Sequence, residues 1–455
     1  MKSRALRDMT QGSVPRHMLA FALPLLAGNF LQQFYNMVDS WAVGNFVGDG
    51  ALAAVGAGAS VMYLFVSLFS GVGVGATVCI AQAFGAGRRE QVNTVVDTVY
   101  RAILISALPV MLLAFLGAEK LVEWMQVEME IAPGACTYIR ILGLGLVATV
   151  GYNINDGILR GLGNSRASLL CLAVATVVNV ALDLLLVTLI PLGVAGVAIA
   201  TVIAQLVSWI CGVIYIRRTY PFLSIRPFKG EFDRTLLKKV LGIGLPAGLQ
   251  MATVSLGGMA VMRKVNTFGR SYAAGYTVGL KIDNLVFLPI QALSSAATAL
   301  VGQNVGAGNW ERVRSAARWV VGCCLGWCAL GILCIYPFRA ELVGVFTSSM
   351  ATIECGALFV GWVLPAYSLL SVIFSLNSVI RGAGQSLVPM LVAVIGQIFV
   401  RVPVVYLLAD KFGPRYMYGG FAIGWAVGAT LAVCYYASGH WKKKALAQAK
   451  NDPAV

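Results

Sequence analysis

Residues 80–92, IAQAFGAGRREQV, return at residues 301–313 as VGQNVGAGNWERV, 221 positions later. A second segment repeats at the same displacement: ILRGLGNS at 158–165 returns as VIRGAGQS at 379–386. Chance or shared hydrophobicity rarely produces two separated matches at one displacement. We therefore interpret the chain as two copies of one half-protein.

A third match indicates what kind of half-protein was duplicated. FALPLLAGN at 21–29 returns as IGLPAGLQM at 243–251, and both segments open long apolar runs. The chain is 58% hydrophobic and only 12% charged, with a mean hydropathy of +0.80. Soluble domains carry about 25% charged residues. The composition therefore indicates an integral membrane protein.

The apolar runs are about 20 residues long, enough to cross a bilayer as helices. We predict an all-α integral membrane protein with twelve transmembrane helices, six in each copy. In the first copy they lie near 18–47, 52–81, 92–117, 132–159, 167–190 and 194–216. In the second copy they lie near 240–268, 273–303, 315–337, 354–380, 387–409 and 418–440. The first run is too long and too polar for a cleaved signal peptide.

A basic, proline-containing segment at 217–239 separates the copies and resembles a strap on the cytoplasmic membrane face. We accordingly predict an N-terminal six-helix lobe at 1–226 and a C-terminal six-helix lobe at 227–455. Most of the 34 Lys and Arg residues fall on the side that holds the strap and both termini. The positive-inside rule then predicts cytoplasmic termini for a multi-pass protein of the plasma (inner) membrane.

The same distribution accounts for the net charge of +15, so nucleic acid is not an expected partner. The ten cysteines form no CxxC pair, and the only two histidines, His17 and His440, lie at opposite ends of the chain. We therefore expect neither a disulfide framework nor a zinc site, and no cofactor apart from a coupling ion.

Ionisable residues inside a membrane are costly, so each one is a functional candidate. Asp39 lies on a polar stripe of the first span with Asn29, Gln32 and Asn36, whose spacing places them on one helical face. Asn179 and Asp183 lie four residues apart in the fifth span, and Thr201 lies in the sixth.

The second copy serves as an internal control for these residues. Asp39, Asn179, Asp183 and Thr201 align with Val261, Val400, Val404 and Trp425. A purely architectural role would predict polar counterparts, yet all four positions become apolar. We therefore expect one site in the first copy, where two carboxylates, an amide and a hydroxyl bind a monovalent cation such as Na⁺ or share a proton.

Four segments carry a family resemblance: LPLLAGNFLQQFYNMVDSWAVGNFVG at 23–48, AFGAGRRE at 83–90, GILRGLGNS at 157–165 and NVALD at 179–183. Together they resemble the multidrug and toxic compound extrusion (MATE) family of cation-coupled antiporters, over nearly the whole chain. The resemblance implies two six-helix lobes related by a pseudo-two-fold axis. Between them lies a central cavity that opens alternately to either side.

By this resemblance Asp39, Asn179, Asp183 and Thr201 match the cation or proton site of the DinF-like branch. Gln32, Asn153 and Asp156 would line the nearby drug cavity, and Pro24 would bend the first helix. We expect Asn36, on the same stripe, and Asp283 to face the cavity as well. Where the NorM-like branch places acids in its second lobe, this chain has Val254 and Leu370.

The expected function is export of lipophilic, often cationic small organic compounds by a monomeric antiporter coupled to Na⁺ or H⁺. The first alternative is a lipid-linked oligosaccharide flippase, whose cationic cavity would rest on Lys281 and Arg401 alone. A channel is a further possibility, although the repeat and the one-sided site favour coupled transport. A membrane-embedded enzyme is disfavoured because no nucleophile with a partner base and no phosphate-cradling motif is present. The roles of Lys281, Asp283 and Arg401 stay open.

Overall fold

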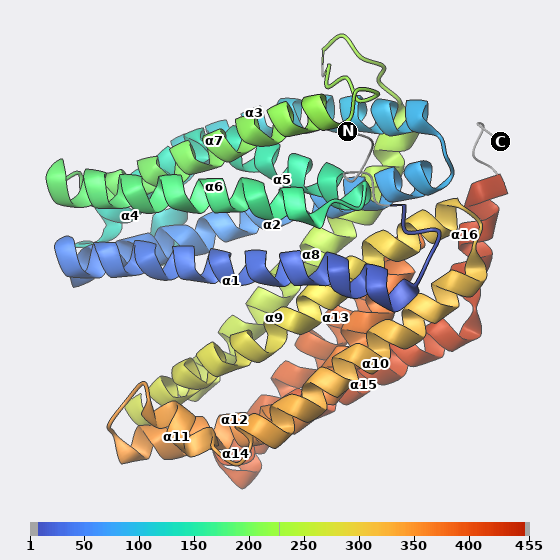
Figure 1. The fold of residues 1–455 in the computed structure, drawn as a ribbon. Coiled ribbons are helices and arrows are strands. Elements are labelled where there is room, and N and C mark those ends of the chain that lie inside the picture. Colours follow the sequence, from blue (N-terminus) through green and yellow to red (C-terminus); the bar gives the residue numbers. More distant parts are fainter. Residues whose placement is uncertain (1–7, 227, 451–455) are drawn as a thin grey trace. The chain divides into compact units, whose positions relative to one another are not determined.

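The computed structural model describes residues 8–226 and 228–450, and the regular elements in them are all helices (Figure 1). The chain forms two compact units. The first is built mainly from Leu23–Gly248, and the second from Met9–Ala22 together with the residues from Leu249 onward. Helices α1 and α8 therefore each contribute to both units.

The first unit takes in most of α1 and the opening turns of α8. Its helices are α1 (Val14–Phe46), α2 (Asp49–Gly85), α3 (Arg89–Trp124), α4 (Ala132–Leu144), α5 (Leu146–Gly161), α6 (Ser165–Leu184), the π-helical η1 (Leu185–Leu189) and α7 (Val194–Thr219). Helix α2 packs against α5, and α6 packs against α7.

The second unit repeats this order with small differences. Its helices are α8 (Arg234–Asn266), α9 (Arg270–Gly306), α10 (Trp310–Ile335), α11 (Arg339–Gly344), α12 (Met350–Gly382), α13 (Leu387–Val394), the π-helical η2 (Ile395–Arg401), α14 (Val402–Phe412), α15 (Gly419–Ser438) and α16 (His440–Lys450). Helix α9 packs against α12, which is the counterpart of α2 against α5.

Ten of the described helices are long and apolar enough to cross a membrane, and the bent pair α4 and α5 would make an eleventh. The remaining predicted span, the first in the chain, is helix α1. Its 33 residues are sufficient in length, but Asn29, Gln32, Gln33 and Asn36 lower the hydropathy of its middle. The protein is thus an all-helical, multi-span membrane protein.

The duplication is visible in individual contacts. Thr77 on α2 donates hydrogen bonds of 3.0 Å to the carbonyls of Gly73 and Gly157, joining α2 to α5. Thr298 on α9 donates to the carbonyls of Ser294 and Ser378, at 3.0 and 3.2 Å. Each of these three positions is displaced by 221 residues between the copies. A buried hydroxyl therefore joins the same pair of helices in both units.

One turn repeats just as closely. Gly163 follows α5 with a φ of 80°, and Gly384 follows α12 with a φ of 91°. This left-handed conformation is strained for residues with a Cβ, which explains why both copies keep glycine in the RGxG segment.

The fourth predicted span differs between the copies. In the first it is broken at Gly145 into α4 and α5, with a bend of 52°. A Cβ at Gly145 would lie 2.9 Å from Cβ of Val202 on α7, so α7 packs directly into the break. The counterpart α12 runs unbroken through Pro365 and Ala366.

The segment between the copies is bound to the first unit. The carboxylate of Asp97 on α3 accepts a 2.7 Å bond from the amide of Arg226, and Arg101 donates a 2.6 Å bond to the carbonyl of Gly230. Asp233 caps α8 by accepting bonds from the amides of Thr235 and Leu236. The described residues of this segment are therefore bonded to the first unit on both sides of residue 227.

Candidate functional site

The predicted carboxylates meet inside the first unit. Asp39 lies on α1 and is half-buried, whereas Asn179 and Asp183 lie on α6 and are fully buried. With its amide nitrogen toward the carboxylates, Asn179 donates to Asp39 Oδ1 at 2.9 Å and to Asp183 Oδ2 at 3.3 Å. The two carboxyl groups also lie within hydrogen-bonding reach of each other. The structure thus brings together three residues that the sequence assigned to one site.

Thr201 joins this group through a tyrosine. The hydroxyl of Tyr35 on α1 donates a 3.4 Å hydrogen bond to Thr201 Oγ1 on α7, and Tyr35 is also within hydrogen-bonding reach of Asp39. Helices α1, α6 and α7 therefore all supply polar atoms to one place.

Two tyrosines of the site were not predicted. Tyr35 lies one helical turn before Asp39, and Tyr138 on α4 is buried within electrostatic range of both carboxylates. In the second copy their positions hold Gly257 and Phe359, so neither keeps a hydroxyl. The internal comparison would have identified both residues had it been extended from acids and amides to phenols.

The site is acidic. Among the described residues, the groups that act on Asp39 and Asp183 include no Lys or Arg. Oδ1 of Asp183 is buried without a hydrogen-bond donor in the part of the chain that the structure describes. A carboxylate oxygen of this kind, close to Asp39, fits a hard monovalent cation or a proton. No group of three or more acidic, cysteine or histidine ligands occurs in the described residues, so the donor set does not resemble a transition-metal site.

The predicted cavity residues divide into two groups. Gln32 and Asn36 have exposed side chains on α1. On α5, Asn153 donates to the carbonyl of Thr149 at 2.8 Å and accepts from Ser70 at 3.2 Å. Asp156, also on α5, forms a 2.8 Å ion pair with Arg160, so part of its charge is balanced within its own helix.

Asp283 belongs to the second unit. It accepts a 2.7 Å hydrogen bond from the hydroxyl of Tyr367 on α12. Lys281, two residues earlier, lies over the ring of Phe346 at 5.5 Å and is exposed. Two positions apart on one helix, the two residues do not share a face, and they have different partners.

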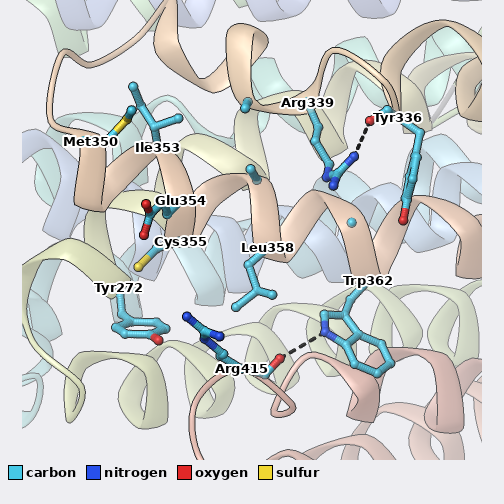
Figure 2. Close-up of a pocket in the computed structure, with 13 residues that line it drawn as sticks. Tyr272, Tyr336, Arg339, Met350, Ile353, Glu354, Cys355, Leu358, Trp362 and Arg415 are labelled. Atoms are coloured by element: carbon cyan, nitrogen blue, oxygen red, sulfur yellow. Dashed lines mark hydrogen bonds between the residues drawn. The ribbon is translucent and has the colours of Figure 1, made fainter.

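A separate cavity of about 810 Å³ lies in the second unit, between α9, α11, α12 and the turn before α15. Figure 2 shows Arg339 donating to the carbonyl of Tyr336, at 2.7 Å, and Trp362 donating to the carbonyl of Arg415, at 3.0 Å. None of the predicted site residues lines it. This cavity is therefore distinct from the carboxylate site.

Comparison with known proteins agrees with the duplicated architecture. The MatE family model matches the chain twice, at residues 24–185 and 246–407. The chain belongs to the MatE family. The second match begins and ends 222 residues after the first, so the family unit is the repeat found in the sequence. The resemblance to multidrug and toxic compound extrusion proteins is confirmed at the family level.

Individual relatives extend over the whole chain. The probable multidrug resistance protein YpnP of Bacillus subtilis is 29% identical over 443 residues, which is 96% of this chain and 97% of YpnP. A solved MATE structure in the bent conformation matches with a TM-score of 0.91 at 21% identity, over 98% of this chain and 100% of that one. Another, in the straight conformation, gives 0.89 at 21% identity, over 99% and 100%. These likenesses show the two-lobe MATE fold.

Proposed function

We propose that this MatE-family protein is a cation-coupled antiporter that exports lipophilic, often cationic small organic compounds by alternating access. The observation that carries the proposal is the pair of carboxylates on α1 and α6, which Asn179 joins and on which no Lys or Arg of the described residues acts. A carboxylate inside a membrane is stable only when a cation neutralises its charge or a proton binds to it. Either a coupling Na⁺ or a coupling H⁺ would meet this need. The name of the relative YpnP, a probable multidrug resistance protein, supports drugs as cargo.

The proposed architecture is finer than the fold match. Helix α1 also crosses the membrane, which brings the number of transmembrane spans to twelve. The lobes 1–226 and 227–455 are related by a pseudo-two-fold axis. Both termini are cytoplasmic in the plasma membrane, and the protein acts as a monomer. The arrangement of Asp39, Asn179, Asp183 and Thr201 supports assignment to the DinF-like branch.

The coupling ion is Na⁺ or H⁺. The amide of Asn179 can serve either ion, because its nitrogen donates to the carboxylates when the site is empty and its oxygen can turn toward a bound cation. A proton would instead neutralise one carboxyl and leave a hydrogen bond between the pair.

Ion entry is proposed to act through α1. Neutralising Asp39 and Asp183 removes the need to keep the middle of α1 hydrated, so the helix repacks. Pro24 supplies the point of bending because it has no backbone N–H to donate. Repacking narrows the cavity beside Gln32, Asn36, Asn153 and Asp156, and releases substrate outward. Asp283 of the second unit is proposed to contact substrate as well.

The alternatives lack a comparable observation. A flippase for pyrophosphate-linked sugars would need several cationic groups in one cavity, but Arg401 is buried against Phe421 and Lys281 lies over the ring of Phe346. MatE-family proteins are transporters rather than enzymes, which disfavours a membrane-embedded enzyme. A channel would not require two buried carboxylates without a counter-ion.

Efflux from proteoliposomes tests the proposal. The purified protein is reconstituted, and efflux of a cationic dye is followed under an imposed Na⁺ gradient and, separately, an imposed proton gradient. We expect one gradient to drive efflux and Asp39→Asn to abolish it while leaving thermal unfolding nearly unchanged. Asp410→Asn is the matched control, because Asp410 is an exposed carboxylate paired with Lys264. Gradient-driven efflux by the Asp39→Asn protein at the wild-type rate would refute the proposal.

A further inference from the structure

The second copy has a polar cluster of its own, at positions where the first copy is apolar. Asp283, Tyr367 and Arg401 align with Met62, Leu146 and Val180 at the displacement of 221 residues. The asymmetry between the copies therefore runs in both directions: each has polar residues that the other lacks.

The contacts of this cluster include both signs of charge. Tyr367 donates to Oδ1 of Asp283 at 2.7 Å. Arg401 ends η2 and is 5% exposed, and its guanidinium lies 4.6 Å from the ring centroid of Phe421 on α15. The charge of Arg401 acts on Asp283 and on Tyr276. Unlike the site in the first unit, this cluster contains its own cation.

The guanidinium of Arg401 reaches the place equivalent to the first unit's site. A Cβ on Gly257 would lie 3.1 Å from Nη2 of Arg401, and Gly257 occupies the position of Tyr35. Arg401 also follows Val400, the counterpart of Asn179. The small residue at 257 leaves the space that the arginine fills.

The other walls of that space have become aromatic. Phe359 stands where the first copy has Tyr138, and Trp425 stands where it has Thr201. Their rings pack on Phe421, with centroids 5.7 Å away in both cases. Two hydroxyl-bearing residues of the first copy are thus replaced by rings that pack edge-on against Phe421, the ring on which the Arg401 guanidinium lies.

One atom of Arg401 has no partner. Its Nε is buried without a hydrogen-bond acceptor among the residues that the structure describes. A guanidinium held by hydrogen bonds alone would have all its N–H groups paired. The ring of Phe421 therefore helps to hold the guanidinium in place, and Asp283 acts on it only as a nearby charge.

We propose that Arg401 is a tethered cation, which occupies in the second unit the place that the coupling cation occupies in the first. The guanidinium neutralises Asp283 in every state of the transport cycle. The second unit consequently takes up no ion, and the number of ions per cycle is set by Asp39 and Asp183 alone. This inference rests on the proposed function, because it assigns the coupling ion to one unit.

The experiment measures cation-dependent stability, which requires no transport. Thermal unfolding of the detergent-purified protein is followed over a Na⁺ series, with choline keeping ionic strength constant, and over a pH series. All variants carry Asp39→Asn together with Asp183→Asn, which removes both carboxylates of the first site. In this background we expect Arg401→Gln to gain a new stabilisation by Na⁺ or by low pH, because Asp283 has lost its counter-ion.

Two further variants identify the origin of that effect. Arg401→Gln with Asp283→Asn should lose the new cation dependence, since no charge is left to neutralise, and Arg401→Lys should never acquire it. If Arg401→Gln fails to fold without cations, recovery of folded protein in high Na⁺ or at low pH is the same result. Unchanged cation dependence in Arg401→Gln would overturn the inference, as would a gain that persists in the double variant. The first site is inactive in all of these variants, so their results do not depend on it. Failure of the proposed function would be seen separately, as a lack of cation dependence in the wild-type protein.

Discussion

The hydroxyl of Tyr35 on α1 donates a 3.4 Å hydrogen bond to Thr201 on α7. This contact ties the helix that carries Asp39 to the helix that carries the fourth predicted ligand. The phenol can therefore hold the ligands in place when an ion arrives.

Replacing Tyr35 with phenylalanine should weaken ion binding without abolishing it. Loss of one hydrogen bond worth about 1 kcal/mol predicts a roughly fivefold rise in the half-saturating cation concentration for efflux. Tyr63→Phe, on the exposed face of α2, serves as control and should leave this concentration unchanged. An equal change in both variants would exclude Tyr35 from the site.

Asn179→Ala should have a larger effect. It removes the donor to both carboxylates, and hydrogen bonds to charged groups contribute about 1.5–3 kcal/mol, so we expect gradient-driven efflux to fall roughly tenfold or more. The repeat offers a matched control, Val400→Ala, at the equivalent position of the second copy. If both variants transport alike, the amide has no special role.

Gly145→Ala should damage the site from a distance. The added Cβ would meet Val202, the neighbour of Thr201, and overpacking of this kind costs about 1–3 kcal/mol. We expect a lower free energy of unfolding and weaker cation dependence of efflux. Val202→Ala in the same chain should restore both by making room. If Val202→Ala restores neither the stability nor the cation dependence, the break at Gly145 does not depend on α7.

Thr77→Val and Thr298→Val should behave as a pair. Each removes one buried hydroxyl that joins two helices, and each should lower the free energy of unfolding by about 1 kcal/mol. Neither should alter the cation concentration that half-saturates efflux, because the hydroxyls belong to the shared scaffold. A selective loss of coupling in Thr77→Val would contradict that assignment.

The helices themselves could be predicted because apolar runs of membrane length are a local signal. Each of the twelve predicted spans corresponds to a helix, or to consecutive helices, of the described structure. The break at Gly145 could not be predicted, because the side chain packed against it, Val202 on α7, is 57 positions away in the sequence. The short α11 and α16 also escaped prediction, since they are too short to give a membrane-length pattern.

The site was predictable where charge was rare. Asp39 and Asp183 stand out because they are acidic residues in apolar helices. The apolar residues at the equivalent positions of the second copy favoured a functional role for them over a purely architectural one. Tyr35 and Tyr138 were missed because a phenol is tolerated in a membrane helix for its ring alone. Arg401 was noticed but could not be assigned, because its partners Phe421 and Asp283 are brought to it by tertiary packing.

The linker bound to α3 changes where flexibility can reside. Because Asp97 and Arg101 hold it by its backbone, the stretch before α8 cannot serve as a slack tether between the copies. The passage from one unit to the other falls instead inside α1, after Ala22, and inside α8, after Gly248. Each place lies within two residues of a proline, Pro24 or Pro246. The connections between the two units are therefore helical segments of α1 and α8. Lengthening the loop before α8 would leave the stiffness of these segments unchanged.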